Sequence, residues 1–326
     1  MSGLLDGIRK TARVLAGVFF LAGGLSGCAL IIPQTDALHR TWPADLAEKA
    51  EVPGVPFYPQ EDYQCGPAAL ATSLASFKVP VTPDDLVDKV YLPARQGSLQ
   101  IEMLAGARGY GMVSYELPQS FEAVLREVAA GTPVIVLQDY GVWPLRIWHY
   151  AVVAAYDKTK GEVVLRSGMK ENLVIPFSVF EYTWKESHYW AMVTVPPDRL
   201  PVSAKESDYL NAIVAMERVA KPEAARTAYA TFLGRWPDNV TASIGLANAE
   251  YALGRVRQAE LVLWGAAERH PESVIVLNNL AQTLSDQGRT EEALQVIDRA
   301  AEAGGPFAPT VADTRLAILK RLGKSP

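Results

Sequence analysis

Residues 55–70 read VPFYPQEDYQCGPAAL, and this stretch decides how the first part of the chain folds. Pro67 is tolerated in a helix only near its first turn, so it predicts a helix that begins within a residue or two of Cys65. The small residues around the proline let other backbone approach closely. A cysteine at a helix start lies at the positive end of the helix dipole, which stabilises thiolate and lowers the thiol pKa. The stretch therefore predicts a nucleophilic thiol at Cys65, with an inert core cysteine as the alternative.

The first 28 residues have the three zones of an export signal. Basic residues come first, VLAGVFFLAGG follows as an apolar stretch short for a permanent anchor, and LSGC ends the segment at Cys28. LSGC resembles the lipobox of bacterial lipoproteins, which implies cleavage before Cys28 and lipid on that cysteine. Ala29 stands where an inner-membrane retention signal would have aspartate, so the resemblance favours the periplasmic face of the outer membrane. An ordinary signal peptide or an uncleaved anchor is the alternative.

Charge and cysteine content narrow the function further. The formal net charge is −5, and the basic residues are dispersed, so no nucleic-acid partner is expected. The chain has two cysteines, so lipid on Cys28 would leave Cys65 as a single free thiol in an oxidising compartment. No cofactor and no metal are expected.

The pattern changes twice along the chain. Residues 29–51 contain prolines and no convincing strand, and we expect a tether there. Residues 52–198 give helix signals first and then valine-rich and aromatic strand signals, which predicts an α+β domain with an antiparallel sheet. Residues 203–326 lose the strand signals and repeat themselves.

The repeat has a period of 34 residues. Matching small residues that fall at this spacing are Ala225, Ala259 and Ala293. Helix–turn–helix units of this length resemble the tetratricopeptide repeat, which implies an all-α solenoid and a protein partner. Two well-formed units span 240–273 and 274–307, a degenerate unit starts near Ser207, and a last helix follows.

A nucleophilic thiol needs a base, and His149 is the best placed histidine. It opens the apolar strand pattern WHYAVVAAYD, where it can face a helix start across a cleft. His188 is the alternative.

QEDYQCGPAAL and WHYAVVAAYD together resemble the bacteriocin-processing, double-glycine-leader peptidases within the papain-like cysteine peptidases, over about residues 52–197. The resemblance implies Cys65 as nucleophile, His149 as general base and a preceding glutamine as oxyanion donor. Gln60 fits the last role best, and Gln64 is the alternative.

The sequence departs from this family at one position. The family has an aspartate at the end of the strand after the histidine strand, and EVVLRSG places Ser167 there. We expect Ser167 to lie beside His149, because antiparallel pairing returns the strand end towards the histidine. Asp157 is the alternative for the third residue.

Two functions fit these patterns. The first is a membrane-anchored cysteine peptidase that hydrolyses peptide bonds of an envelope protein or peptide, with repeats that recruit protein. The second is a non-catalytic peptide-binding or assembly lipoprotein that keeps the peptidase fold.

Overall fold

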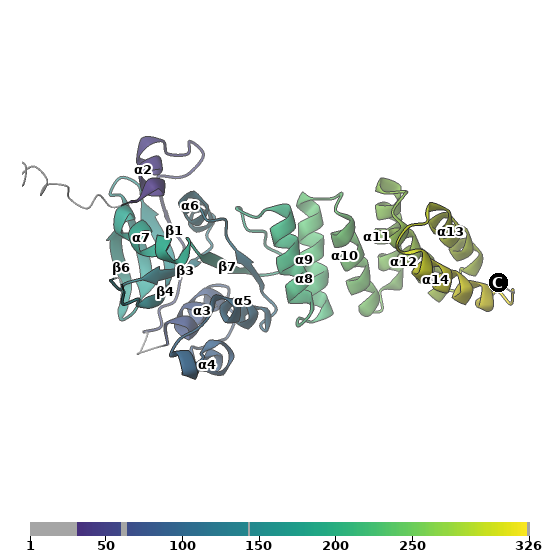
Figure 1. The fold of residues 1–326 in the computed structure, drawn as a ribbon, viewed down its shortest axis with the longest axis horizontal. Helices are drawn as coiled ribbons and strands as arrows, with labels where there is room; N and C mark the ends of the chain where they lie inside the picture. Colours follow the sequence, from purple (N-terminus) through teal and green to yellow (C-terminus); the bar gives the residue numbers. More distant parts are fainter. Residues whose placement is uncertain (1–30, 60–63, 143, 325–326) are drawn as a thin grey trace, which may run out of the picture.

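The computed structural model describes residues 31–59, 64–142 and 144–324. Figure 1 shows an elongated molecule in which a mixed α/β domain is followed by a row of paired helices. Cys28 with its expected lipobox, and Gln60, lie outside the described residues. Within the described ranges, no helix combines the length and the apolar character needed to cross a membrane.

The segment before the first domain is packed, so the tether expected over 29–51 is wrong for its described part. It contains helix α2 (Pro33–Arg40) and strand β1 (Lys49–Glu51). The Glu181 carboxylate accepts hydrogen bonds from two backbone N–H groups in the first turn of α2, at 2.9 and 2.5 Å. Leu38 is buried, and β1 pairs with the sheet. These interactions satisfy backbone groups that a free tether would leave to water.

The sheet has seven antiparallel strands among the described residues. They are β1 (Lys49–Glu51), β2 (Val113–Glu116), β3 (Val134–Asp139), β4 (Trp148–Asp157), β5 (Glu162–Ser167), β6 (Lys170–Pro176) and β7 (Ala191–Val195). Their order is β2-β7-β3-β4-β5-β6, and β1 pairs with the end of β4 that β3 leaves free. The strand that begins next to His149 is therefore central and paired on both sides.

Helices cover both faces of this sheet (Figure 1). One face carries α3 (Cys65–Ser76), α4 (Asp84–Val90) and α5 (Gln100–Arg108), and the other carries α2, α6 (Phe121–Ala129) and α7 (Phe177–Trp184); the short 3₁₀ helices are η1 (Pro93–Arg95) and η2 (Lys185–Ser187). Side chains of a strand alternate between faces. Accordingly, Tyr150 and Val152 pack in the cluster that contains α3, whereas Ala151 and Val153 pack in the cluster that contains α6 and α7.

The remaining helices form the predicted repeats. They are α8 (Glu206–Glu217), α9 (Pro222–Arg235), α10 (Val240–Ala252), α11 (Val256–Arg269), α12 (Val274–Asp286), α13 (Thr290–Ala303) and α14 (Ala308–Arg321). The two well-formed units begin with α10 and α12. Gly254 and Gly288, one period apart, have φ values of 73° and 77° in the turns between paired helices, a backbone conformation that favours glycine.

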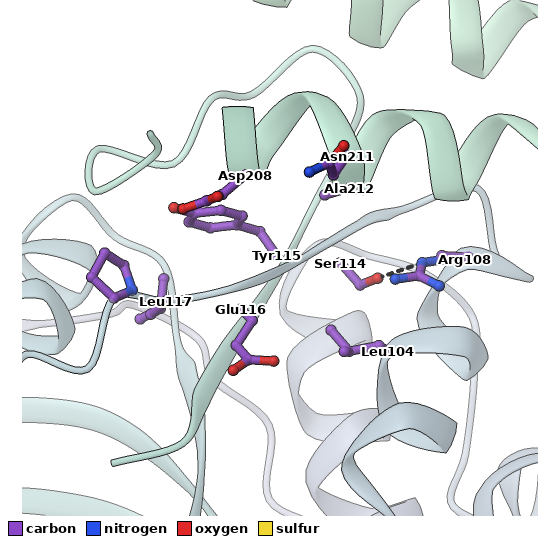
Figure 2. Close-up of a pocket in the computed structure, with 10 residues that line it drawn as sticks. Leu104, Arg108, Ser114, Tyr115, Glu116, Leu117, Asp208, Asn211 and Ala212 are labelled. Atoms are coloured by element: carbon purple, nitrogen blue, oxygen red, sulfur yellow. Dashed lines mark hydrogen bonds between the residues drawn. The ribbon is translucent and has the colours of Figure 1, made fainter. Parts of the chain in front are cut away.

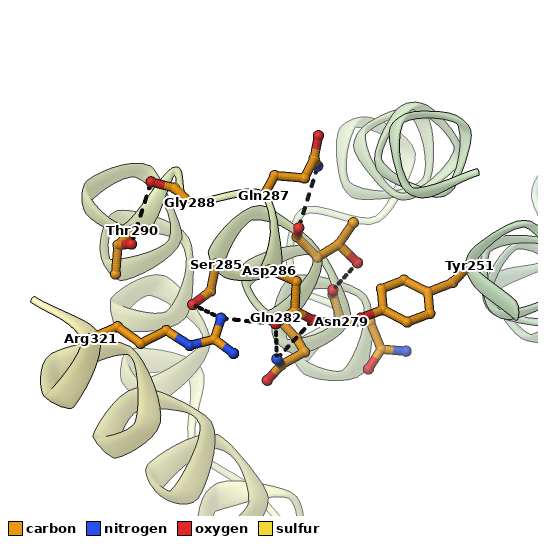
Figure 3. Close-up of polar contacts among 10 residues, drawn as sticks. Tyr251, Asn279, Gln282, Ser285, Asp286, Gln287, Gly288, Thr290 and Arg321 are labelled. Atoms are coloured by element: carbon orange, nitrogen blue, oxygen red, sulfur yellow. Dashed lines mark hydrogen bonds and ion pairs between the residues drawn. The ribbon is translucent and has the colours of Figure 1, made fainter. Parts of the chain in front are cut away.

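Polar contacts also link the first helices of successive units (Figure 3). The Asp286 carboxylate accepts hydrogen bonds from the Tyr251 hydroxyl of α10 at 2.8 Å, from the amide of Gln282, and from Arg321 of α14 at 2.8 Å. A hydrogen bond therefore joins the C-terminal ends of the first helices of these two units.

The first repeat shares the core of the α/β domain. The rings of Tyr115 on β2 and Tyr209 on α8 meet edge to face at 5.5 Å. The carboxylate of Glu127 on α6 accepts hydrogen bonds from the N–H and hydroxyl of Ser203, at 2.8 and 2.6 Å. A cavity of about 330 Å³ lies at this junction, bordered by α5, β2 and α8 (Figure 2). Removing α8 would therefore open the core of the first domain.

Candidate active site

Cys65 is the first residue of α3, as the position of Pro67 predicts. Its sulfur lies against the backbone N–H groups of Gly66, of Cys65 itself and of Tyr150 on β4. Gly66 lets Ser98 pack closely against the start of α3, because a Cβ at Gly66 would come within 2.1 Å of the Ser98 hydroxyl oxygen. The thiol is thus held between a helix start and the strand residue that follows His149.

The predicted direction of the Cys65 pKa is wrong. Burial raises the pKa of the thiol above its ordinary value, and this effect outweighs the surrounding N–H groups, each of which lowers it. The helix start lowers the thiol pKa as expected. Desolvation of the thiolate in an apolar cluster raises it by more than the three backbone N–H groups lower it. The sequence shows the helix start and does not show the depth of burial.

His149 is the second residue of β4, and its ring is held by two neighbours. Its Nε2 lies 2.9 Å from the hydroxyl oxygen of Ser167. The Tyr140 ring stacks on the imidazole, with centroids 5.1 Å apart and planes inclined by 26°. Burial lowers the pKa of His149 to about 4, so the imidazole is neutral at neutral pH.

Ser167 lies beside His149, as the sequence pattern predicts. β4 and β5 form the antiparallel hairpin that the sequence pattern predicts, and the register brings the end of β5 back towards the start of β4. Asp157, the alternative third residue, lies at the far end of β4, about 26 Å away for eight residues of strand. It pairs with Lys49 at 3.7 Å, so it cannot orient the imidazole.

The thiol and the imidazole are neighbours without a direct hydrogen bond among the described residues. Cys65 contacts the backbone beside His149, while the His149 ring bonds to Ser167. Such pairs are often long in a ligand-free protein and tighten with substrate. His188, the alternative base, is exposed at the end of η2.

The structure adds residues that sequence reasoning missed. Gln138 in β3 and Tyr140 just after β3 continue the hydrogen-bonded chain from Ser167, and Gln138 donates to Thr183 on α7. Between them, the buried carboxylate of Asp139 accepts hydrogen bonds from Arg146 and from the N–H groups of Gly141 and Ile147. It thereby closes the β3–β4 loop just before His149. The polar run QDY at the end of an apolar strand was the available signal.

Comparison with known proteins agrees with this architecture. Residues 52–192 match the Peptidase_C39 like family, and residues 217–263 and 245–309 match the tetratricopeptide repeat. No curated protein matches the chain. By its family match, the first domain is a C39-like peptidase domain. The chain therefore consists of a C39-like peptidase domain followed by tetratricopeptide repeats, which supports a peptidase-related function and interaction with protein.

Three solved structures illustrate the similarity of the first domain. A Bacillus anthracis protein described as a C39-like peptidase is 18% identical, with 46% of this chain and 98% of that chain covered and a TM-score of 0.39. The peptidase domain of Streptococcus ComA, a bifunctional ABC transporter of a quorum-sensing pathway, is 19% identical, with 44% and 98% covered and a TM-score of 0.36. A double-glycine-motif protease from an AMS/PCAT transporter, solved with its leader peptide, is 20% identical, with 44% and 93% covered and a TM-score of 0.35.

Proposed function

We propose that the chain is a thiol peptidase of the cell envelope in which Cys65 attacks a peptide carbonyl and His149 takes the thiol proton. One observation carries the proposal. The Cys65 sulfur lies against the N–H of Tyr150, one residue from a histidine whose ring is fixed by Ser167. A nucleophile, a base and a residue that orients the base then come from three adjoining elements, which is the arrangement that covalent acyl transfer needs.

The proposed reaction begins from a neutral pair. The S–H bond breaks as its proton passes to the His149 imidazole, and the sulfur electron pair forms the S–C bond while the carbonyl electrons move onto oxygen. The backbone N–H of Cys65 at the helix start donates to this oxyanion, and Gln60 is the proposed second donor. His149 then protonates the leaving amine, and water hydrolyses the acyl-enzyme.

Ser167 replaces a carboxylate with a neutral partner for the imidazole. A neutral hydrogen bond contributes about 0.5–1.5 kcal/mol net, against about 1.5–3 kcal/mol for one to a charged group. If the difference appears fully in the transition state, it corresponds to a rate about ten- to thirtyfold lower. Ser167 therefore supports a slow peptidase.

A second function, peptide binding without cleavage, is favoured by different observations. Burial raises the pKa of Cys65 and lowers that of His149 to about 4, so neither side chain is charged at neutral pH. Turnover separates the two functions. The full chain should be incubated with a peptide mixture and the products identified by mass spectrometry. New peptide ends support the peptidase, and peptides bound and released intact support the binding module.

We also propose that the first helices of the repeats bind a protein segment. Asn248 is exposed on α10, one turn before Tyr251, and shares the face that reaches Asp286 on α12. Stacked helix pairs form an extended concave surface of this kind.

Asn248→Arg should therefore reduce the capture of proteins from an envelope fraction by the full chain. Cleavage of a short peptide should stay unchanged. A bulky charge on this surface blocks a docked segment without touching the peptidase core. Leu261→Arg is the matched control, since Leu261 is exposed on α11, the second helix of the same unit. Equal capture by both variants would contradict this role for the surface.

The anchor proposal concerns Cys28, which we propose carries lipid in the outer membrane. Pro33, the first residue of α2, comes five positions after Cys28, so an acylated cysteine would hold the domain within about 17 Å of the bilayer. The mature N-terminus should begin at an acylated Cys28 in intact-mass measurements. A retained Met1 or an unmodified Cys28 would contradict the anchor and leave the peptidase proposal standing.

A further inference from the structure

The hydrogen bonds around Ser167 have a direction that can be followed from a fixed end. The Thr183 hydroxyl donates to main-chain carbonyl oxygens of α7, at 3.0 Å to Phe180 and 3.1 Å to Val179. A carbonyl can only accept, and a hydroxyl has one proton. The Thr183 oxygen must therefore accept from its other partner, the side-chain amide of Gln138, whose Nε2 is 2.7 Å away.

The orientation of the Gln138 amide determines the donor and the acceptor in the next two contacts. With its nitrogen turned to Thr183, Gln138 presents Oε1 to Tyr140, whose hydroxyl donates to it at 3.1 Å. The Tyr140 proton is then used, so the 3.4 Å contact with Ser167 needs the serine hydroxyl as donor. The Ser167 proton is used in turn. Its oxygen can take part in the 2.9 Å contact with His149 Nε2 only as an acceptor.

We propose that Gln138, Tyr140 and Thr183 are positioning residues which, through Ser167, hold the proton of neutral His149 on Nε2 and leave Nδ1 as the atom that receives the Cys65 proton. This inference rests on the proposed peptidase function for its catalytic meaning. A neutral imidazole has one N–H, so fixing it at Nε2 makes the other nitrogen the base. A free serine hydroxyl would also be able to donate to Nε2, which would put the proton on Nδ1 and block the reaction.

The chain of side chains thereby performs part of the task of a carboxylate. A carboxylate accepts only, and so it selects the tautomer by itself; Ser167 accepts only because its own proton is already engaged. The ring of Tyr140 adds a second constraint, because it stacks on the imidazole and restricts its plane. Tyr140 therefore acts on both the tautomer and the orientation of His149.

Tyr140→Phe separates these two effects, since it keeps the ring and removes the hydroxyl. The test is the imidazole ¹⁵N spectrum of the full chain near pH 7, in which protonated and unprotonated ring nitrogens have distinct shifts. The chain has four histidines, and His149→Gln identifies the signals of His149. In the unmodified chain Nε2 should carry the proton. In Tyr140→Phe the proton should move, partly or fully, to Nδ1, and kcat should fall about tenfold with KM unchanged.

Thr183→Val, which keeps the side-chain shape, should move the proton in the same direction. It provides the same test if Tyr140→Phe does not fold. Tyr182→Phe is the control, because Tyr182 lies exposed on α7 and should leave the spectrum unchanged. A proton on Nδ1 in the unmodified chain, or an unaltered tautomer in the folded variants, overturns the proposal. If the spectra are as predicted but no peptide is cleaved, the tautomer proposal stands and the peptidase function is rejected.

Discussion

Replacing Cys65 with alanine should lower kcat/KM for peptide cleavage about 10⁴-fold or more, because the atom that forms the acyl-enzyme is removed. Alanine fits the helix start without strain, since the cysteine already occupies a helical position between small residues. Loss of activity should therefore occur without loss of fold. The measurement is steady-state cleavage of a short peptide, with circular dichroism to compare the folded states.

The control for this variant lies on the same helix. Ser76→Ala changes a hydroxyl at the far end of α3, where it donates to the Thr72 carbonyl. It should leave kcat/KM unchanged. Cleavage that survives in Cys65→Ala would show that the activity belongs to another group, and the account of the thiol would be wrong.

His149→Gln should lower kcat by about 10²- to 10⁴-fold, the contribution typical of a general base. Glutamine keeps a polar group near Ser167 but cannot take the thiol proton.

In the unmodified chain, activity should persist at pH 5 and fall near pH 4. Burial lowers the pKa of His149 to about 4, and only the neutral imidazole, whose Nδ1 carries no proton, can accept the thiol proton. The pH profile of kcat/KM measures this.

The same pKa difference predicts how acid affects stability. An unfolded histidine takes up a proton near pH 6.5, about its ordinary value, whereas the folded His149 does so only at about 4. The unfolded state therefore binds more protons in this window, and His149 should reduce stability as pH falls from about 6.5 to about 4. His149→Gln should remove that component of the acid sensitivity. Acid sensitivity that is the same in His149→Gln as in the unmodified chain would contradict a half-buried, neutral imidazole at this position.

Much of the fold could be predicted because its signals are local. Pro67 set the start of α3, and the 34-residue period set the starts of α10 and α12. The hairpin between β4 and β5 followed from two apolar runs joined by a short polar turn, and it brought Ser167 to His149.

The elements that the sequence pattern did not predict are formed by tertiary contacts. α2 has a weak pattern of its own and is fixed by Glu181, which is about 150 residues away in sequence. β2 has four residues and becomes a strand by pairing with β7. α7 reads FSVFEYTW, whose bulky aromatic residues favour a strand locally; burial of Phe180 and Trp184 against α6 and the sheet decides for a helix.

The candidate site shows the same division. Residue types and spacing pointed to Cys65 and His149, but the state of both depends on burial that no local pattern records. The direction of the hydrogen bonds through Gln138 and Tyr140 depends on carbonyl groups of α7, which only the folded chain brings to them.

The central claim is that Cys65 is a nucleophile served by His149, and covalent labelling tests it most directly. The full chain should be treated with a peptidyl acyloxymethyl ketone, and the adduct located by intact mass and peptide mapping. We expect one adduct, at Cys65, that forms much more slowly in His149→Gln, whereas iodoacetamide, a small reagent, should react with Cys65 in both proteins at high pH. An unlabelled Cys65 in the unmodified chain, or labelling that does not depend on His149, would contradict it.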